Sequence, residues 1–268
     1  SETVDTINPC RLDYTKRLGV NNVRYPCKEL SGKYVDRFSD KIGGQCTNEK
    51  MRSDGKGACA PFRRLHLCHH NLETIDTTST KHDLLLEVCM AAKYEGASIK
   101  TYYPRHQHKY DDSQLCTVLA RSFADIGDII RGKDLFYGNT YESTQRDKLE
   151  SKLKDIFGKI HDDVTTNGKN GAKELQERYQ KDGEDYYKLR EDWWTANRHT
   201  VWEAITCDAG SGKYFRQTCG DSGDEKGPSQ AHDKCRCKDK NGRPDDQVPT
   251  YFDYVPQYLR WFEEWAED

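Results

Sequence analysis

The apolar residues of this chain recur every three or four positions across most of residues 79–268, and they lose this period over residues 1–78. A spacing of three and four places apolar side chains on one face of a helix. The pattern therefore predicts a mainly α-helical fold. The expected helices cover about 80–95, 115–131, 144–164, 172–188 and 190–206, and a last helix begins at Pro256.

Two segments lack this helical period. Residues 1–78 are rich in glycine, asparagine, aspartate and cysteine, and residues 208–250 are rich in glycine, aspartate and lysine. Such residues mark turns and loops, and Gly96 and Gly132 are expected to end the first two helices. We therefore expect a cysteine-rich irregular subdomain over residues 1–78 and a helical-bundle subdomain over residues 79–268, with one long loop inside the second.

The chain contains 11 cysteines, which favours an extracellular protein held by disulfides. Cys235 and Cys237 share one face of an extended segment, so each is expected to pair elsewhere. The odd number leaves one cysteine as a reactive thiol or with a partner outside this segment, and we favour the outside partner. The sequence leaves the connectivity open. The disulfide candidates are Cys10, Cys27, Cys46, Cys59, Cys68, Cys89, Cys116, Cys207, Cys219, Cys235 and Cys237.

No sequence pattern indicates an enzyme or a cofactor site. Residues 210–213 are similar to the end of a phosphate-binding loop, but Tyr214 stands where that motif needs serine or threonine. Two sets of residues could supply metal ligands: Cys207, Cys219, Cys235 and Cys237, or His66, Cys68, His69 and His70. Neither set has the ligand spacing of known zinc sites, so we expect no metal and no cofactor.

Composition limits the remaining functions. The formal net charge is −3, from 42 lysines and arginines against 45 aspartates and glutamates, which excludes a globally basic nucleic-acid binder. No run of about 20 apolar residues occurs, so we expect no segment of this chain to insert into a membrane. Hydrophobic residues make up only 34% of the chain, so disulfides are expected to contribute to its stability.

A polyanionic ligand would need a local basic patch, and three clusters stand out. The first lies in the long loop and comprises Lys234, Arg236, Lys238, Lys240 and Arg243. The second comprises Arg105, His106, His108 and Lys109, and the third comprises Arg63, Arg64, His66, His69 and His70. Disulfides beside the first cluster would hold it in place, which makes it the favoured glycan site. The alternative is that these charges are only solvated.

Charged residues also interrupt the apolar helix over residues 115–131. Four of them follow one another at spacings of three and four: Arg121, Asp125, Asp128 and Arg131. We expect them to form ion pairs within and between helices, and a receptor contact is the alternative. Trp193, Trp194 and Trp202 are expected in the core, although tryptophans are also common binding hot spots.

Several longer motifs resemble those of one protein family. Residues 120–134 (ARSFADIGDIIRGKD) resemble the signature of the alpha-class Duffy-binding-like domain. This domain belongs to the variant erythrocyte membrane proteins of the malaria parasite Plasmodium falciparum. Further similar motifs cover residues 57–68, 91–96, 192–198, 201–207 and 251–265, so the resemblance extends over nearly the whole chain.

The resemblance implies a Duffy-binding-like fold of three subdomains, of which this chain is similar to the first two and lacks the third. The last helix carries four aromatic residues, Tyr258, Trp261, Phe262 and Trp265. We expect the face with Trp261 and Trp265 to be exposed, or covered by an element that follows in the longer family members.

The resemblance also implies a role in adhesion. It places the chain in the extracellular part of a transmembrane protein on the infected red cell. The implied partners are host red-cell or endothelial receptors, sulfated glycosaminoglycans or blood-group sugars, and antibodies. Rosetting, in which infected cells bind uninfected ones, is the expected process. The alternative is a structural or immune-decoy segment that presents variable loops while neighbouring domains bind the receptor.

Overall fold

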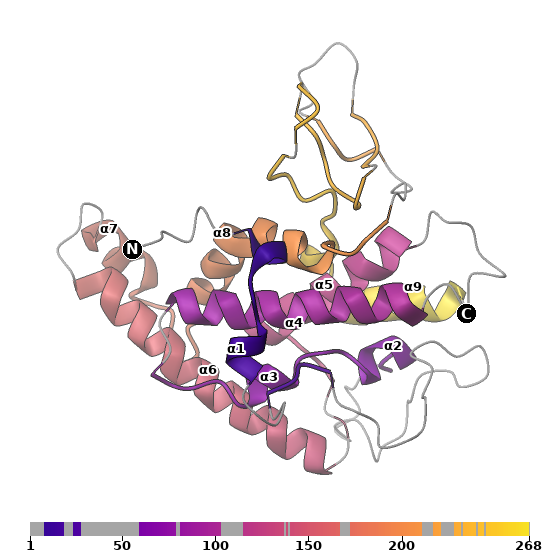
Figure 1. Cartoon of the computed structure of the whole chain (residues 1–268). Helices are drawn as coiled ribbons and strands as arrows, with labels where there is room; N and C mark the ends of the chain where they lie inside the picture. The colour runs from indigo at the N-terminus through magenta and orange to yellow at the C-terminus, as the bar shows by residue number, and fades with distance from the viewer. Residues whose placement is uncertain are drawn as a thin grey trace.

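The computed structural model describes residues 8–18, 24–27, 59–78, 81–102, 115–136, 138, 140–166, 172–210, 217–220, 228–231, 233–239, 241–243 and 245–267. The main helices are α4 (Lys81–Tyr102), α5 (Leu115–Arg131), α6 (Thr140–Thr166), α7 (Ala172–Tyr179), α8 (Tyr187–Ile205) and α9 (Gln257–Glu267). The short ones are η2 (Pro9–Arg11), α1 (Thr15–Leu18), α2 (Phe62–Leu65), α3 (His70–Glu73) and η6 (Phe252–Tyr254). The mainly helical prediction is confirmed (Figure 1). Each of these helices is too short or too polar to cross a membrane.

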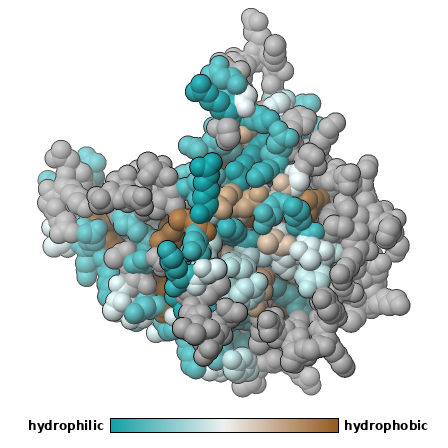
Figure 2. Space-filling view, in the orientation of Figure 1, coloured by the Kyte–Doolittle hydropathy of each residue, from teal (hydrophilic) through white to brown (hydrophobic). Residues whose placement is uncertain are grey.

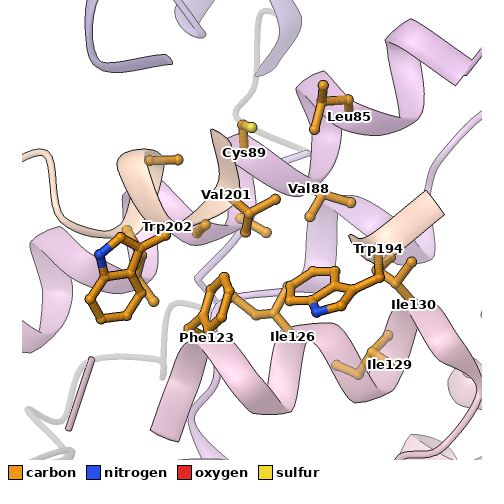
Figure 3. Close-up of a cluster of buried hydrophobic side chains, with 14 of the residues drawn as sticks. Leu85, Val88, Cys89, Phe123, Ile126, Ile129, Ile130, Trp194, Val201 and Trp202 are labelled. Carbon is orange, nitrogen blue, oxygen red and sulfur yellow. The ribbon is translucent and has the colours of Figure 1, made fainter. Parts of the chain in front are cut away.

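Helices α4, α5 and α8 form the centre of the molecule around a group of aromatic rings. Phe123 of α5 lies beside two tryptophans of α8, with its ring centroid 5.1 Å from that of Trp194 and 5.2 Å from that of Trp202. Figure 3 shows this group together with Val88 of α4. The side chains of Trp193, Trp194 and Trp202 are buried, so the prediction that they belong to the core is confirmed.

We had expected Gly96 to end its helix, but α4 continues past it to Tyr102. A Cβ atom at position 96 would lie 1.9 Å from the carbonyl oxygen of Ile205. Glycine is therefore needed here because α4 and the end of α8 approach each other closely. The sequence shows the glycine but not the distant segment that requires it.

The ends of the other helices follow local turn chemistry. Gly132, at φ +71°, ends α5 as predicted. Helix α6 begins at Thr140, somewhat earlier than the expected residue 144. Helix α7 stops at Tyr179, well before the expected residue 188. Gly183 (φ +70°) and Tyr186 (φ +54°) form a turn between α7 and α8, and the left-handed backbone at these two positions cannot continue a helix.

Disulfides join segments that are distant in the sequence. The described pairs are Cys10–Cys207, Cys27–Cys68, Cys116–Cys235 and Cys219–Cys237. Cys59 is also disulfide-bonded, and Cys46 lies outside the described residues. As predicted, Cys235 and Cys237 take different partners. A metal site built on Cys207, Cys219, Cys235 and Cys237 is excluded, because all four sulfur atoms are in disulfides.

Among the described cysteines, Cys89 is the unpaired one. It lies on α4 inside the core, only 1% exposed, and burial raises the pKa of its thiol (Figure 3). A thiol at this depth cannot reach a cysteine of another segment without displacing the helices around it. The expectation of an outside partner is therefore wrong for Cys89, which serves as a small apolar core residue.

Residues 59–78 pack directly against the helical body, although we placed them in the first subdomain. Leu72 and Ile75 are buried in the same core cluster as Val88 of α4. The boundary near residue 78 stays a prediction, because most of residues 1–58 lie outside the described part of the chain.

Helix α9 packs with its charged face inward. Arg260 and Glu264 are buried together with Trp261, whereas Phe262 on the opposite face is 74% exposed. Trp261 is only 1% exposed, and Trp265 packs against the same small cluster. The described chain therefore covers Trp261 itself, and the expectation that further chain is needed to cover it is corrected. The inner face of α9 is charged because α2 and α5 present charges to it.

Candidate functional site

A buried network of charges joins α2, α5 and α9. At its centre, Asp125 is fully buried and pairs with two arginines. Asp125 Oδ2 lies 2.6 Å from Arg63 Nη2, and Asp125 Oδ1 lies 2.9 Å from Arg260 Nη2. Arg260 also lies 2.5 Å from Asp128, and Asp128 pairs with Arg131 at 2.8 Å. Each of these buried charges thus has a partner of opposite sign, which a buried ion requires.

The network continues into α4 and into the segment after α5. Arg63 Nη1 donates a hydrogen bond of 2.8 Å to Ser122 Oγ, which donates one of 2.7 Å to Glu95 Oε1. Arg64 pairs with Asp134 at 2.6 Å. The charges therefore hold four helices and a connecting segment in one arrangement.

Burial and ion pairing compete at the two carboxylates of α5. Burial alone would raise the pKa of Asp125, but the charges of Arg63 and Arg260 outweigh it and hold this pKa well below the usual 3.8. At Asp128 burial prevails over the charges of Arg260 and Arg131 and raises the pKa to about 6. Both groups are ionised at neutral pH, so the ion pairs are intact there.

These positions assign a structural role to the charges of α5. The four residues are at most 6% exposed: Arg121, Asp125, Asp128 and Arg131. The predicted ion pairs are confirmed for Asp125, Asp128 and Arg131, and burial of all four side chains excludes a receptor contact by them. The third basic cluster is also not a surface patch, because Arg63 and Arg64 are each 2% exposed.

The first basic cluster lies in a projecting part of the molecule. We call the described residues between positions 207 and 250 the lobe, which rises from the helices in Figure 1 and is largely hydrophilic in Figure 2. The Cys116–Cys235 disulfide ties the lobe to α5, and the Cys219–Cys237 disulfide closes it internally. Trp202 Nε1 of α8 donates a hydrogen bond of 3.0 Å to the carbonyl of Cys235. The base of the lobe is thus fixed to two core helices.

Arg236 points toward the helices rather than toward solvent. Its Nη2 donates to the Glu203 carbonyl at 2.6 Å, and its Nε donates to Thr206 Oγ1 at 2.8 Å. Burial lowers the pKa of Arg236, and the carboxylate of Glu203 partly offsets that effect. Arg236 therefore anchors the lobe to the end of α8, which does not support its predicted role as a ligand-facing cation.

Three other cations of this cluster are exposed. Lys234 has a left-handed backbone (φ +53°), and its Nζ donates a hydrogen bond of 3.0 Å to the Cys207 carbonyl. Lys238 pairs with Asp233, and both side chains are largely exposed. Arg243 is exposed, and its backbone N–H donates to Asp239 Oδ1 at 2.8 Å. The structure thus places these three cations on one disulfide-fixed lobe.

The remaining predicted glycan-binding residues lie outside the described part of the chain. These are Lys240, Arg105 and Lys109, together with His106 and His108. Their predicted role is therefore neither supported nor contradicted by position.

Sequence reasoning missed the exposure of apolar side chains in the segment that follows the lobe along the chain. Five large side chains of the segment from η6 to α9 are between 45% and 74% exposed: Tyr251, Tyr254, Tyr258, Leu259 and Phe262. The signal was present in the sequence, since Arg260 and Glu264 share one face of this helix and Tyr258 and Phe262 share another. We had grouped Tyr258 and Phe262 with Trp261 and Trp265 on one aromatic face, whereas the structure buries Trp261 and exposes Tyr258 and Phe262.

A hollow lies between α6, α7 and the turn that leads to α8. Figure 1 shows α6 and α7 side by side. The rings of His161, Tyr179 and Tyr186 line it together with polar side chains, including Gln180 and Glu184. Aromatic walls with a few polar groups suit a small neutral ligand. No pattern in the sequence indicates that these residues meet.

Comparisons with known proteins agree on one family. The sequence profile described as the Duffy binding domain matches residues 57–260. The solved NTS-DBL1-alpha and CIDR-gamma double domain of PfEMP1 from the Plasmodium falciparum varO strain is 39% identical, with a TM-score of 0.72, over 97% of this chain and 36% of that chain. The NTS-DBL1(alpha-1) domain from the same strain is 40% identical, with a TM-score of 0.67, over 91% of this chain and 51% of that chain.

A third solved structure is a DBL-beta domain of PfEMP1 bound to human ICAM-1. It is 27% identical to this chain, with a TM-score of 0.65, over 97% of this chain and 50% of that chain. The chain therefore spans about half, or less, of the solved relatives described here. No curated protein sequence matches it.

Proposed function

The chain belongs to the Duffy binding domain family, and from that premise we propose that it is a receptor-binding adhesion domain. The host receptor ICAM-1 in the DBL-beta complex supports this class of function. The relatives of this chain include domains of PfEMP1, and this supports an extracellular location on the surface of an infected red cell. We also propose that residues 1–78 and 79–268 are the first two subdomains of a longer Duffy-binding-like domain, in keeping with the share of the relatives that the chain spans.

We propose further that the ligand is a red-cell glycan of the sulfated, heparin-like class, bound during rosetting. The observation that carries this proposal is the group of exposed cations Lys234, Lys238 and Arg243 on the lobe. A sulfated glycan needs several cations held at a fixed spacing, and the disulfides of the lobe reduce the entropy lost on binding. On binding, a sulfate group would take the place of the Asp233 carboxylate as the partner of Lys238.

The proposal is tested by binding of the purified chain to immobilised heparin over a salt series, with uninfected red cells in parallel. Saturable binding that weakens as salt rises is expected, because the attraction between exposed charges is screened. The lobe variant combines Lys234→Glu, Lys238→Glu and Arg243→Glu and should bind heparin at least about tenfold more weakly, a difference of about 1.4 kcal/mol. Arg236 stays unchanged because it anchors the lobe.

A matched control has the same change in net charge at another place. The control variant combines Lys173→Glu, Lys181→Glu and Lys188→Glu, three exposed positions on and near α7 and α8. It should retain heparin binding. Equal losses in both variants would show that net charge alone, and not the lobe, governs the attraction, and would overturn the site.

Other outcomes separate the alternative functions. Red-cell binding without heparin binding would indicate a neutral sugar or a protein receptor, and the hollow beside α7 would then be the next site to mutate. Absence of binding to red cells and to glycans would favour the structural or immune-decoy role, in which neighbouring domains bind the receptor.

A further inference from the structure

Two histidines and a glutamate meet at the start of α3. His69 precedes this helix, His70 begins it and Glu73 ends it, so the carboxylate lies one helical turn beyond the two imidazoles. Glu73 Oε1 lies 3.7 Å from His69 Nε2 and 3.0 Å from His70 Nδ1. One potential ligand atom from each residue lies within 4.8 Å of the others. Small side-chain rotations would bring these atoms to the distance of about 2.0–2.2 Å at which a zinc ion holds nitrogen and oxygen ligands.

We propose that His69, His70 and Glu73 bind one transition-metal ion of the zinc class. Two imidazoles and one carboxylate form a known zinc donor set, which leaves the fourth position of a tetrahedral ion for water. The nitrogen and oxygen donors also suit nickel or copper ions. This role is independent of the proposed adhesion function.

The orientation of His69 supports metal binding. Its Nδ1 lies 2.9 Å from the Leu67 carbonyl and donates a hydrogen bond to it. That bond fixes the tautomer, so Nε2 carries the lone pair and faces Glu73. Metal-binding histidines commonly use their second nitrogen in this way.

His70 requires one change before it can bind an ion. Without metal, its Nδ1–H donates a hydrogen bond to Glu73 Oε1. On binding, the ring proton moves to Nε2, and the metal replaces that proton between Nδ1 and the carboxylate. The net charge of the ring does not change. Arg64 is the nearby arginine that would repel a cation, and its charge is balanced by Asp134 at 2.6 Å.

The backbone that carries the three residues is held from several sides. The Cys27–Cys68 disulfide precedes His69 directly, and the Cys68 N–H donates to Glu95 Oε2 at 2.9 Å. The His70 N–H donates to the Pro26 carbonyl at 2.9 Å. Lys152 Nζ of α6 donates to the Glu73 carbonyl at 2.8 Å. Ligands on a fixed backbone lose little entropy when they bind.

The site is also accessible. The side chains of His69, His70 and Glu73 are 18%, 26% and 19% exposed, so an ion can reach them while part of their surface is shielded from water. The structure changes the ligand set considered from the sequence, because the sulfur of Cys68 is in a disulfide and Glu73 contributes in its place.

The test is a calorimetric titration of tag-free, folded chain with Zn²⁺ alone. One equivalent should bind, and His69→Gln and His70→Gln should each weaken binding at least about tenfold. His199→Gln is the control, since His199 is exposed on α8 and makes a hydrogen bond to Thr200, and it should bind zinc as the unchanged chain does.

Glu73→Gln is the third ligand variant, and circular dichroism checks that each variant is folded. Co²⁺ provides an independent readout, because a tetrahedral site gives visible absorption that His69→Gln should abolish. The proposal is overturned if the unchanged chain binds no zinc at millimolar concentration, or if the folded variants bind it as tightly as the unchanged chain. Neither result affects the heparin experiment, which contains no metal.

Discussion

The buried network and the lobe are both rich in charge, but they use it in opposite ways. In the network, Asp125 and Arg63 are each at most 2% exposed and lie 2.6 Å apart. In the lobe, Lys238 and its partner Asp233 are 45% and 62% exposed. A buried charge depends on its partner for stability, whereas an exposed pair contributes little and can exchange partners with a ligand. Burial, and not charge density, therefore separates structural charges from candidate binding charges.

The largest effect is expected from breaking the network at its centre. Asp125→Asn leaves Arg63 and Arg260 buried with less opposing charge, and should lower the free energy of unfolding by about 3–5 kcal/mol. Urea denaturation measures this change. Asp155→Asn is the control on the exposed face of α6 and should change stability by less than about 0.5 kcal/mol. Similar midpoints for the two variants would contradict a structural role for the network.

Acid should weaken the network without any mutation. The pKa values of Asp125 and Asp134 are lowered in the folded chain, because their arginine partners outweigh burial. The unfolded chain therefore takes up more protons below about pH 4, and stability should fall as the pH decreases through that range. Urea midpoints measured at successive pH values report this loss.

Asp128 should contribute the opposite pH dependence. Its pKa rises to about 6 on folding, so between pH 6 and pH 4 the folded chain binds the extra proton and gains stability as pH falls. The free energy of unfolding of the unchanged chain, minus that of Asp128→Asn, should increase from pH 7 to pH 4.5. A constant difference over this range would show that the carboxylate titrates normally.

The next effect concerns the close contact of α4 with α8. Gly96→Ala places a methyl group against the Ile205 carbonyl and should lower stability by about 1–3 kcal/mol or more. Gly210→Ala is the matched control, because a Cβ atom there meets nothing within 4 Å. Thermal denaturation measures the melting temperatures of Gly96→Ala and Gly210→Ala. Equal melting temperatures would show that α4 and α8 can move apart to accept the methyl group at no cost in stability.

The smallest stability effect is expected at the base of the lobe. Arg236→Gln removes hydrogen bonds to Glu203 and Thr206 and should lower stability by about 1–2 kcal/mol. Arg243→Gln, at an exposed position of the same lobe, should change it by less than about 0.5 kcal/mol. If the order of these two effects were reversed, Arg236 would not be the anchor.

Local patterns predicted much of the fold, and distant partners account for the errors. The helix over residues 115–131 and its end at Gly132 follow from periodicity and turn chemistry, which act within a few residues. Gly96 was misread because its reason lies in Ile205, far along the chain. The inward face of α9 was misread because its charges pair with Arg63 and Asp125, which the sequence does not place beside it.

Distant partners also limited what the sequence could predict about the two candidate binding sites. The sequence identified the basic cluster of the lobe, but it could not separate the anchoring Arg236 from the exposed Lys234 and Lys238. That distinction depends on where α8 ends relative to the lobe. The histidines at positions 69 and 70 were visible as a pair, whereas the role of Glu73 depends on the short helix α3 that brings its carboxylate to them.

The separation of binding charges from structural charges is tested most directly by measuring heparin affinity and the urea midpoint together for the lobe variant, the control variant and Asp125→Asn. We predict that the lobe variant loses at least about tenfold in affinity while its urea midpoint stays near that of the unchanged chain. A lobe variant that binds heparin normally, or that loses affinity only because it unfolds, would contradict the separation of binding charges from structural charges.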